Sequence, residues 1–78
     1  MNMIGEKMIY EVRKSYYIGN DYKVKTVAIC ETYQLAKDMI EKMDLKNLKA
    51  IKIVGWQNGF VKGIVEWWDV KDGELVEH

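Results

Sequence analysis

The sequence predicts an α+β fold, in which a four-stranded antiparallel sheet carries one helix packed on one face, in the order β-β-α-β-β. Three observations predict it. Stretches rich in β-branched and aromatic residues alternate in hydropathy, turn-forming residues separate them, and one central stretch has helical periodicity. With 78 residues the chain forms a single domain, 1–78, in which we expect 1–7 to be flexible and 71–78 to be a turn followed by a short strand or a tail.

The N-terminal half begins with two strands. Residues 8–18 are dense in β-branched and aromatic side chains and end at Gly19-Asn20-Asp21, which favours a turn. Residues 22–30 resume the alternation, but its apolar phase moves at Val27. This shift indicates either a bulge near Lys25-Thr26 or burial of both faces from Val27 onward.

A helix follows from Thr32, whose hydroxyl can cap the first turn. Apolar residues recur along one helical stripe, and the opposite face is charged. The stripe consists of Leu35, Ala36, Met39, Ile40 and Met43. Asn47 is suited to the left-handed backbone that ends such a segment.

The C-terminal half adds a second hairpin. Residues 50–56 and 60–70 are predicted as strands on either side of Gln57-Asn58-Gly59, because an Asn-Gly pair is typical of a tight turn. Asp72-Gly73 allows one more turn. A short fifth strand over 74–76 is the alternative to a tail.

One helix cannot cover every apolar residue of such a sheet. The predicted helix-facing set is Tyr10, Val12, Ile51, Ile53 and Ile64. Alternation then sends a second apolar set to the other face, namely Ile9, Val27, Ile29, Val54, Trp56 and Val65. Trp67 and Trp68 are adjacent, so they point to opposite faces. A face this apolar is typical of an interaction site, and we expect a homodimer that forms through this face or an edge strand, with cover by the C-terminal segment as the alternative.

The chain lacks the residues that most catalytic and metal sites need. Cys30 is the sole cysteine and His78 the sole histidine, which excludes an internal disulfide, a structural zinc site and a Ser-His or Cys-His pair. No glycine-rich phosphate loop is present. Two carboxylate pairs lie where solvated strand positions are expected: Glu66 with Asp69, and Glu11 with Glu31. We predict no catalytic residue, no metal and no cofactor.

Charge is balanced overall but uneven along the chain. Twelve basic residues offset twelve acidic ones, while residues 66–78 are acidic and the first hairpin is basic. No stretch approaches the roughly 20 apolar residues of a membrane span, and the single thiol and the absence of a secretion signal favour the cytoplasm. We interpret the acidic end as a docking element for a basic partner surface.

Aromatic anchors and acidic side chains together predict a surface that binds a partner protein. The predicted partner-binding residues are Trp56, Trp67, Trp68, Ile29, Val54, Glu66, Asp69, Asp72 and Glu74.

Part of the chain resembles a known type of small protein. Between Met8 and Met43, the run IYEV, a Gly-Asn-Asp turn and KVKTVAICETYQLAKDMIEKM are similar to a recurrent type of small uncharacterised protein from bacteriophages and their bacterial hosts. The resemblance implies a partner-binding protein without catalytic residues. Small phage proteins of this type are similar to proteins that inhibit host nucleases, restriction or CRISPR effectors, or transcription and replication factors.

The leading hypothesis is therefore a non-enzymatic interaction protein of a phage or mobile element, which binds and inhibits a larger host protein. One alternative is a sheet that binds single-stranded nucleic acid or a nucleotide by aromatic stacking, although the acidic strand disfavours it. The other is a structural subunit of a larger assembly.

Overall fold

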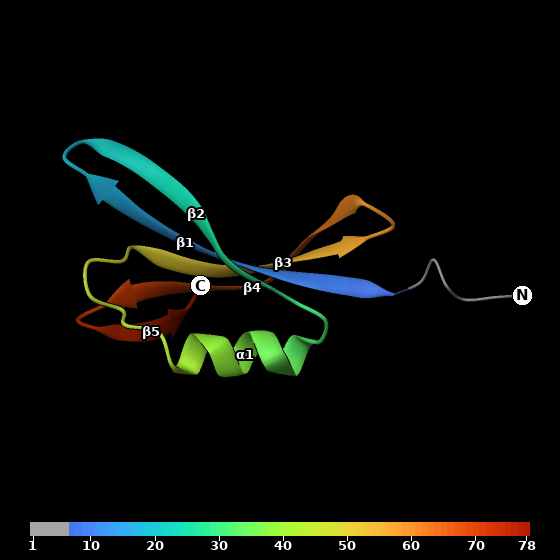
Figure 1. Ribbon diagram of the computed structural model, residues 1–78. Coiled ribbons are helices and arrows are strands. Elements are labelled where there is room, and N and C mark those ends of the chain that lie inside the picture. Colours follow the sequence, from blue (N-terminus) through green and yellow to red (C-terminus); the bar gives the residue numbers. More distant parts are fainter. Residues whose placement is uncertain (1–6) are drawn as a thin grey trace, which may run out of the picture.

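The computed structural model describes residues 7–78, which form a five-stranded antiparallel sheet with one helix against one of its faces (Figure 1). The spatial order of the strands is β2-β1-β3-β4-β5, so the helix links the edge strand β2 to the central strand β3. In chain order the elements are β1 (Met8–Ile18), β2 (Asp21–Cys30), α1 (Tyr33–Glu41), β3 (Ala50–Gln57), β4 (Phe60–Lys71) and β5 (Glu74–Glu77).

The α+β class is confirmed, but the prediction of a four-stranded sheet is wrong. The strand β5 pairs with β4 from Lys71–Glu74 to Trp68–Glu77, so it is a full member of the sheet and not a tail. Asp72 and Gly73 both take left-handed backbone, with φ of 54° and 79°, which turns the chain directly back on itself. Leu75 then packs against the core. The expectation of a flexible start falls, apart from residue 7, outside the described residues.

Local signals placed the other turns and the helix start correctly. Asn58 and Gly59 have φ of 55° and 80°, as a tight hairpin turn requires. The Thr32 hydroxyl accepts a hydrogen bond from the backbone N–H of Leu35 at 3.1 Å, which confirms the predicted helix cap. Asn47 is left-handed, with φ of 65°.

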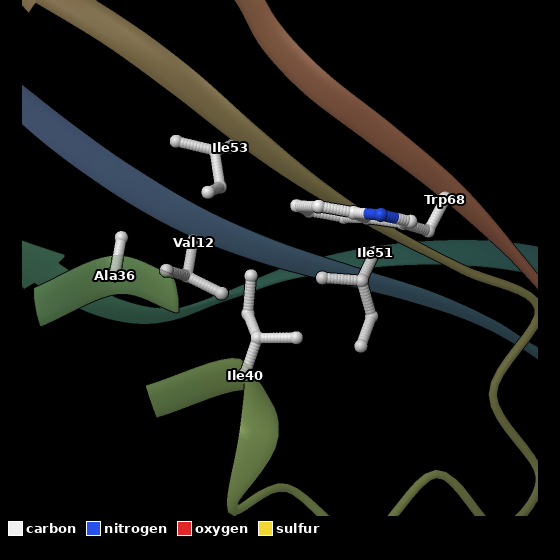
Figure 2. Close-up of a cluster of buried hydrophobic side chains, with 6 residues drawn as sticks. All are labelled: Val12, Ala36, Ile40, Ile51, Ile53 and Trp68. Carbon is white, nitrogen blue, oxygen red and sulfur yellow. The ribbon is translucent and has the colours of Figure 1, made fainter. Parts of the chain in front are cut away.

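The hydrophobic core lies between α1 and the sheet, and Figure 2 shows its buried side chains. They are Val12, Ala36, Ile40, Ile51, Ile53 and Trp68. Trp68 extends from β4 across the sheet toward the helix layer, whereas Trp67 contacts Lys52 and His78 on the opposite face. The prediction that the two adjacent tryptophans point to opposite faces is confirmed.

Two bulges overturn part of the predicted division into faces. In β2, Ala28 pairs with Val12 and Thr26 with Arg13, so Val27 has no partner in the ladder and packs against the core instead. The prediction that Val27 lies on the open face, the sheet face opposite α1, is wrong, and the predicted bulge near Lys25-Thr26 is confirmed.

The second bulge is in β4. Glu66 lies opposite Ile53 and Ile64 opposite Val54, which leaves Val65 between them. Ile64 therefore shares the open face with Val54, and the prediction that Ile64 faces the helix is wrong. Gly55 pairs with Tyr10, so a Cβ on Gly55 would point to the helix side, and Val65 Cγ2 lies 3.1 Å from that position. Val65 is therefore on the helix side, and the prediction that it lies on the opposite face is also wrong. Each extra residue reverses the alternation of a strand.

Among residues 7–78, no helix has the length and apolar character needed to cross a membrane.

Removing core volume tests this packing. Ile53 is fully buried, so we expect Ile53→Ala to lower the free energy of unfolding by about 2–5 kcal/mol. Ile18 is 60% exposed, and Ile18→Ala serves as the control, with an expected change of about 0.5 kcal/mol or less. Urea denaturation followed by circular dichroism measures both. Similar losses in the two variants would contradict the core assignment.

Candidate functional site

The sheet face opposite α1, called the open face below, carries an apolar pocket of about 530 Å³. Strand pairing builds it, because partners across a ladder share a face: Ile9 lies opposite Trp56, and Glu11 lies opposite Ile29. The pocket therefore spans β2, β1 and β3 and reaches the turn between β3 and β4. It is lined by Ile9, Glu11, Thr26, Ile29, Trp56, Asn58 and Gly59.

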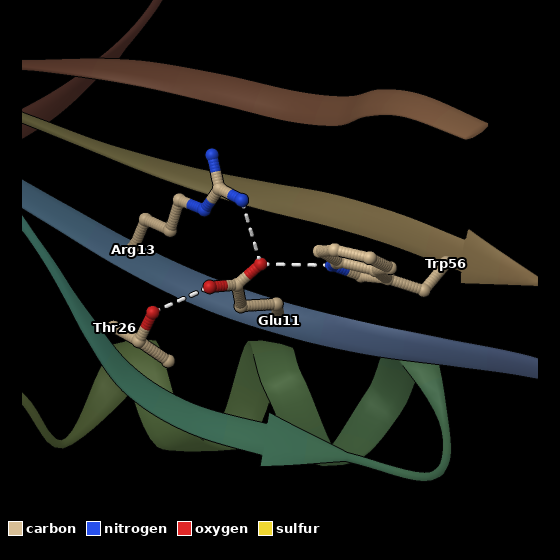
Figure 3. A network of polar contacts seen from close by, with 4 residues as sticks. All are labelled: Glu11, Arg13, Thr26 and Trp56. Carbon is tan, nitrogen blue, oxygen red and sulfur yellow. Dashed lines mark hydrogen bonds and ion pairs between the residues drawn. The ribbon is translucent and has the colours of Figure 1, made fainter. Parts of the chain in front are cut away.

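The charged group of the pocket is the carboxylate of Glu11, a residue that is 7% exposed. Three hydrogen-bond donors surround it, one each from β1, β2 and β3 (Figure 3). Arg13 Nη2 lies 2.9 Å from Oε1, the indole Nε1–H of Trp56 donates to the same oxygen at 2.8 Å, and the Thr26 hydroxyl donates to Oε2. A buried carboxylate is stable only when it is paired and hydrogen-bonded, and this one is both.

These contacts keep Glu11 ionised. The hydrogen bond from Arg13 lowers the pKa of the Glu11 carboxyl most, and burial opposes it by raising the pKa. Hydrogen bonds from Thr26 and Trp56 and the charge of Arg13 lower the pKa further, to about 2 from an ordinary value of 4.5. The network thus joins β2, β1 and β3 around a fixed negative charge.

The same network fixes the orientation of Trp56. Because its indole N–H is held by Glu11, its ring forms one wall of the pocket, and Figure 3 shows the ring lying over the open face beside Glu11. Ile29 of β2 pairs with Glu11 and has 70% of its surface exposed. The pocket is therefore open to solvent and has a rigid aromatic wall.

The second tryptophan of the open face is covered by its neighbours. Lys52 Nζ lies 4.0 Å from the centroid of the Trp67 ring, and the His78 imidazole stacks on that ring at 3.7 Å between centroids, with 6° between the planes. His78 Nδ1 is also 3.2 Å from Asp69 Oδ2. Within the described residues, the indole Nε1 of Trp67 is buried without a hydrogen-bond partner. Trp56, not Trp67, is the aromatic residue that borders the pocket.

The structure divides the predicted partner-binding residues between several places. Six lie on the open face, namely Trp56, Trp67, Ile29, Val54, Asp69 and Glu74. Of these, only Trp56 and Ile29 line the pocket, since Val54 is 3% exposed. The other three lie elsewhere: Trp68 in the core, Glu66 beside the helix and Asp72 in a turn.

Glu66 belongs to a second polar cluster, on the helix side of the sheet. Its carboxylate accepts a hydrogen bond from the Tyr33 hydroxyl and lies 3.6 Å from Lys37 Nζ. The hydrogen bond to Glu66 raises the pKa of Tyr33. Asp69 contacts His78 on the open face, so the sheet separates the two carboxylates that the sequence pairs as Glu66 with Asp69.

Sequence reasoning missed most of the pocket. It considered Glu11 as a partner of Glu31, but the Glu31 carboxylate is 3.6 Å from Lys7, and Glu11 is enclosed by its own donors. The alternation of β1 was the available signal, because it places Ile9, Glu11 and Arg13 on one face. The donors from Thr26 and Trp56 are distant in sequence and carried no such signal.

Within residues 7–78, no group of three or more His, Cys, Asp or Glu side chains is placed to hold a metal ion.

No family model matches the chain, and neither the curated proteins nor the solved structures contain a match to it. The resemblance to small phage proteins therefore stays a prediction.

Acid should remove the stabilisation that Glu11 supplies. Because its pKa is lowered to about 2, the network contributes fully above about pH 4.5 and is lost as the pH falls toward 2. The shift corresponds to a contribution of about 3 kcal/mol. We expect Glu11→Gln to be less stable than the native chain at neutral pH by this order, and its stability to depend less on pH over that interval. Urea denaturation at a series of pH values measures both, and parallel pH profiles would contradict the network.

Proposed function

We propose that the protein is a non-enzymatic protein-interaction module that docks through the open face, with the pocket receiving an apolar side chain of its partner. The observation that carries the proposal is the open pocket between Ile29 and Trp56, whose aromatic wall is held in place by Glu11. Binding hot spots are typically pockets of this kind, filled by an anchor residue. A wall that is already ordered lowers the entropy lost on docking.

The composition of the pocket favours an aliphatic or aromatic anchor. Ile9, Ile29 and Trp56 supply its apolar walls. Glu11 already has three donors, so a polar group of a ligand gains little from it. Burying an apolar side chain removes water from both surfaces, which is the main favourable term in most protein association.

Further apolar residues extend the open face beyond the pocket. Val61 lies opposite Trp56 and is 52% exposed, and Ile64 lies opposite Val54 and is 51% exposed. Together with Ile29 they form an apolar surface around the aromatic wall. Contiguous surfaces of this kind are typical of interaction sites.

The state of Glu11 supports a module without catalysis. A carboxyl with a pKa of about 2 stays ionised near neutral pH, so it is a poor proton donor, and its lone pairs are engaged by Arg13, Trp56 and Thr26. In this proposal the carboxylate organises the pocket and takes no part in a reaction.

For the partner we propose a larger host protein in the cytoplasm, which the module inhibits by occupying its surface. The resemblance to small phage proteins supports this choice. The acidic residues Asp69, Asp72 and Glu74 do not line the pocket. The anchoring contact is therefore made by the pocket. The acidic residues contribute at the rim of the interface, where charges act mainly on the rate of association.

A charged residue in the pocket wall should abolish docking. Ile29→Asp changes an exposed side chain, so we expect the fold to survive and partner affinity to fall at least tenfold, because a carboxylate replaces an apolar wall beside Glu11. The matched control is Leu35→Asp, at a residue of α1 that is 52% exposed on the other side of the sheet. Affinity capture from host-cell lysate, followed by titration of the captured protein, measures the difference.

The outcome that contradicts the proposal is clear. If Ile29→Asp captured the same protein as the native chain with unchanged affinity, the pocket would not be the docking site.

A further inference from the structure

The two edges of the sheet have opposite charge. Within the described part of the chain, β2 pairs only with β1 and β5 only with β4, so each strand has one side without a neighbouring strand. Such edges offer unpaired backbone N–H and C=O groups to another chain. The edge β2 carries Lys23 and Lys25 with one acidic residue, Asp21, whereas β5 carries Glu74 and Glu77 and no basic residue.

These charges oppose pairing of like edges and favour pairing of unlike ones. Two copies of β2 side by side would bring lysines together, and two copies of β5 would bring glutamates together, which destabilises a ladder. Lysine on an edge strand is a common means of preventing such contacts. Pairing of β2 with β5 of another copy brings opposite charges together instead.

The direction of the strands permits this pairing. Each neighbour in the order β2-β1-β3-β4-β5 is antiparallel, so four reversals separate the two edges and both run the same way. A second copy placed beside the first without inversion therefore continues the sheet. Its helix lies on the same face, and its β2 runs parallel to β5 of the first copy.

The side chains of the two edges are also in phase. On the open face, Val24 lies opposite Ser15 and Val76 opposite Asp69, and these valines are 55% and 41% exposed. On the helix side, Lys25 lies opposite Lys14 and Glu77 opposite Trp68. When Val76 is set against Val24 in a parallel ladder, Glu77 falls beside Lys25.

We propose that copies of this chain associate head to tail, by pairing β5 of one copy with β2 of the next. A contact between two different surfaces builds rings or open filaments, whereas a two-fold dimer uses the same surface twice. The homodimer expected from the sequence, through the apolar face or an edge strand, would instead stop at two copies. Because β5 is four residues long, the contact is weak and depends on salt. In the register above the contact ends at Lys25, before Thr26 and Ile29, which are the residues of β2 that line the pocket.

Charge exchange between the edges tests the proposal. We expect the native chain to exceed its 9.2 kDa monomer mass in sedimentation velocity at low salt and rising concentration. The variant with Lys23→Glu and Lys25→Glu, and the variant with Glu74→Lys and Glu77→Lys, should each remain monomeric. The chain with all four substitutions should associate again. It has the net charge of the native chain, so it separates edge pairing from a general effect of charge.

Three results would overturn the proposal: a native chain that is monomeric at every concentration, association that persists unchanged in both two-residue variants, or a four-residue variant that stays monomeric. A native association that disappears on nuclease treatment would also overturn it, because nucleic acid on the basic edge would then be the bridge. Circular dichroism of each variant verifies the fold. The pocket variant Ile29→Asp lies outside the contact and should associate as the native chain does.

Discussion

A single helix of nine residues covers only part of one face of a five-stranded sheet, and the rest of the structure depends on this constraint. Ala36 and Ile40 are its buried residues, and they meet Val12, Ile51 and Ile53 in a small core. The opposite face has no second layer within the described residues. The solvent-facing side of an antiparallel sheet normally carries polar side chains. Here that side carries accessible apolar side chains, which is typical of an interaction site.

The open face is organised by a buried charge. Removing a carboxylate from water is costly, and Glu11 recovers this cost through donors from Arg13, Thr26 and Trp56. These donors come from three adjacent strands, so the carboxylate links the strands at the same point where they form the pocket. A side chain that stabilises the sheet therefore also orders the candidate docking site.

Features set by neighbouring residues were predictable from the sequence. The Thr32 cap and the Asn58-Gly59 turn depend on a few adjacent residues, and the opposite orientation of Trp67 and Trp68 follows from strand geometry alone. Features set by distant residues were not. The bulge at Val65 depends on how β4 fits β3, and it reversed the side assigned to Ile64.

The fifth strand and the pocket illustrate the same limit. A four-residue strand has too little pattern to be distinguished from a tail, and β5 is ordered by the Asp72-Gly73 turn and by the packing of Leu75. The role of Glu11 depends on Thr26 and Trp56, which approach it only when β2 and β3 pair with β1. Alternation in β1 indicates the face of Glu11 but not its partners.

In the free protein, Glu11 holds Trp56 as a rigid wall of an open pocket. Nitrogen-15 relaxation of the Trp56 indole Nε1–H, measured by NMR without any partner, tests it most directly. We expect an order parameter for this N–H near that of rigid backbone, about 0.85. A value below about 0.6, typical of a flexible group, would show that the wall is not ordered before docking and would contradict the account.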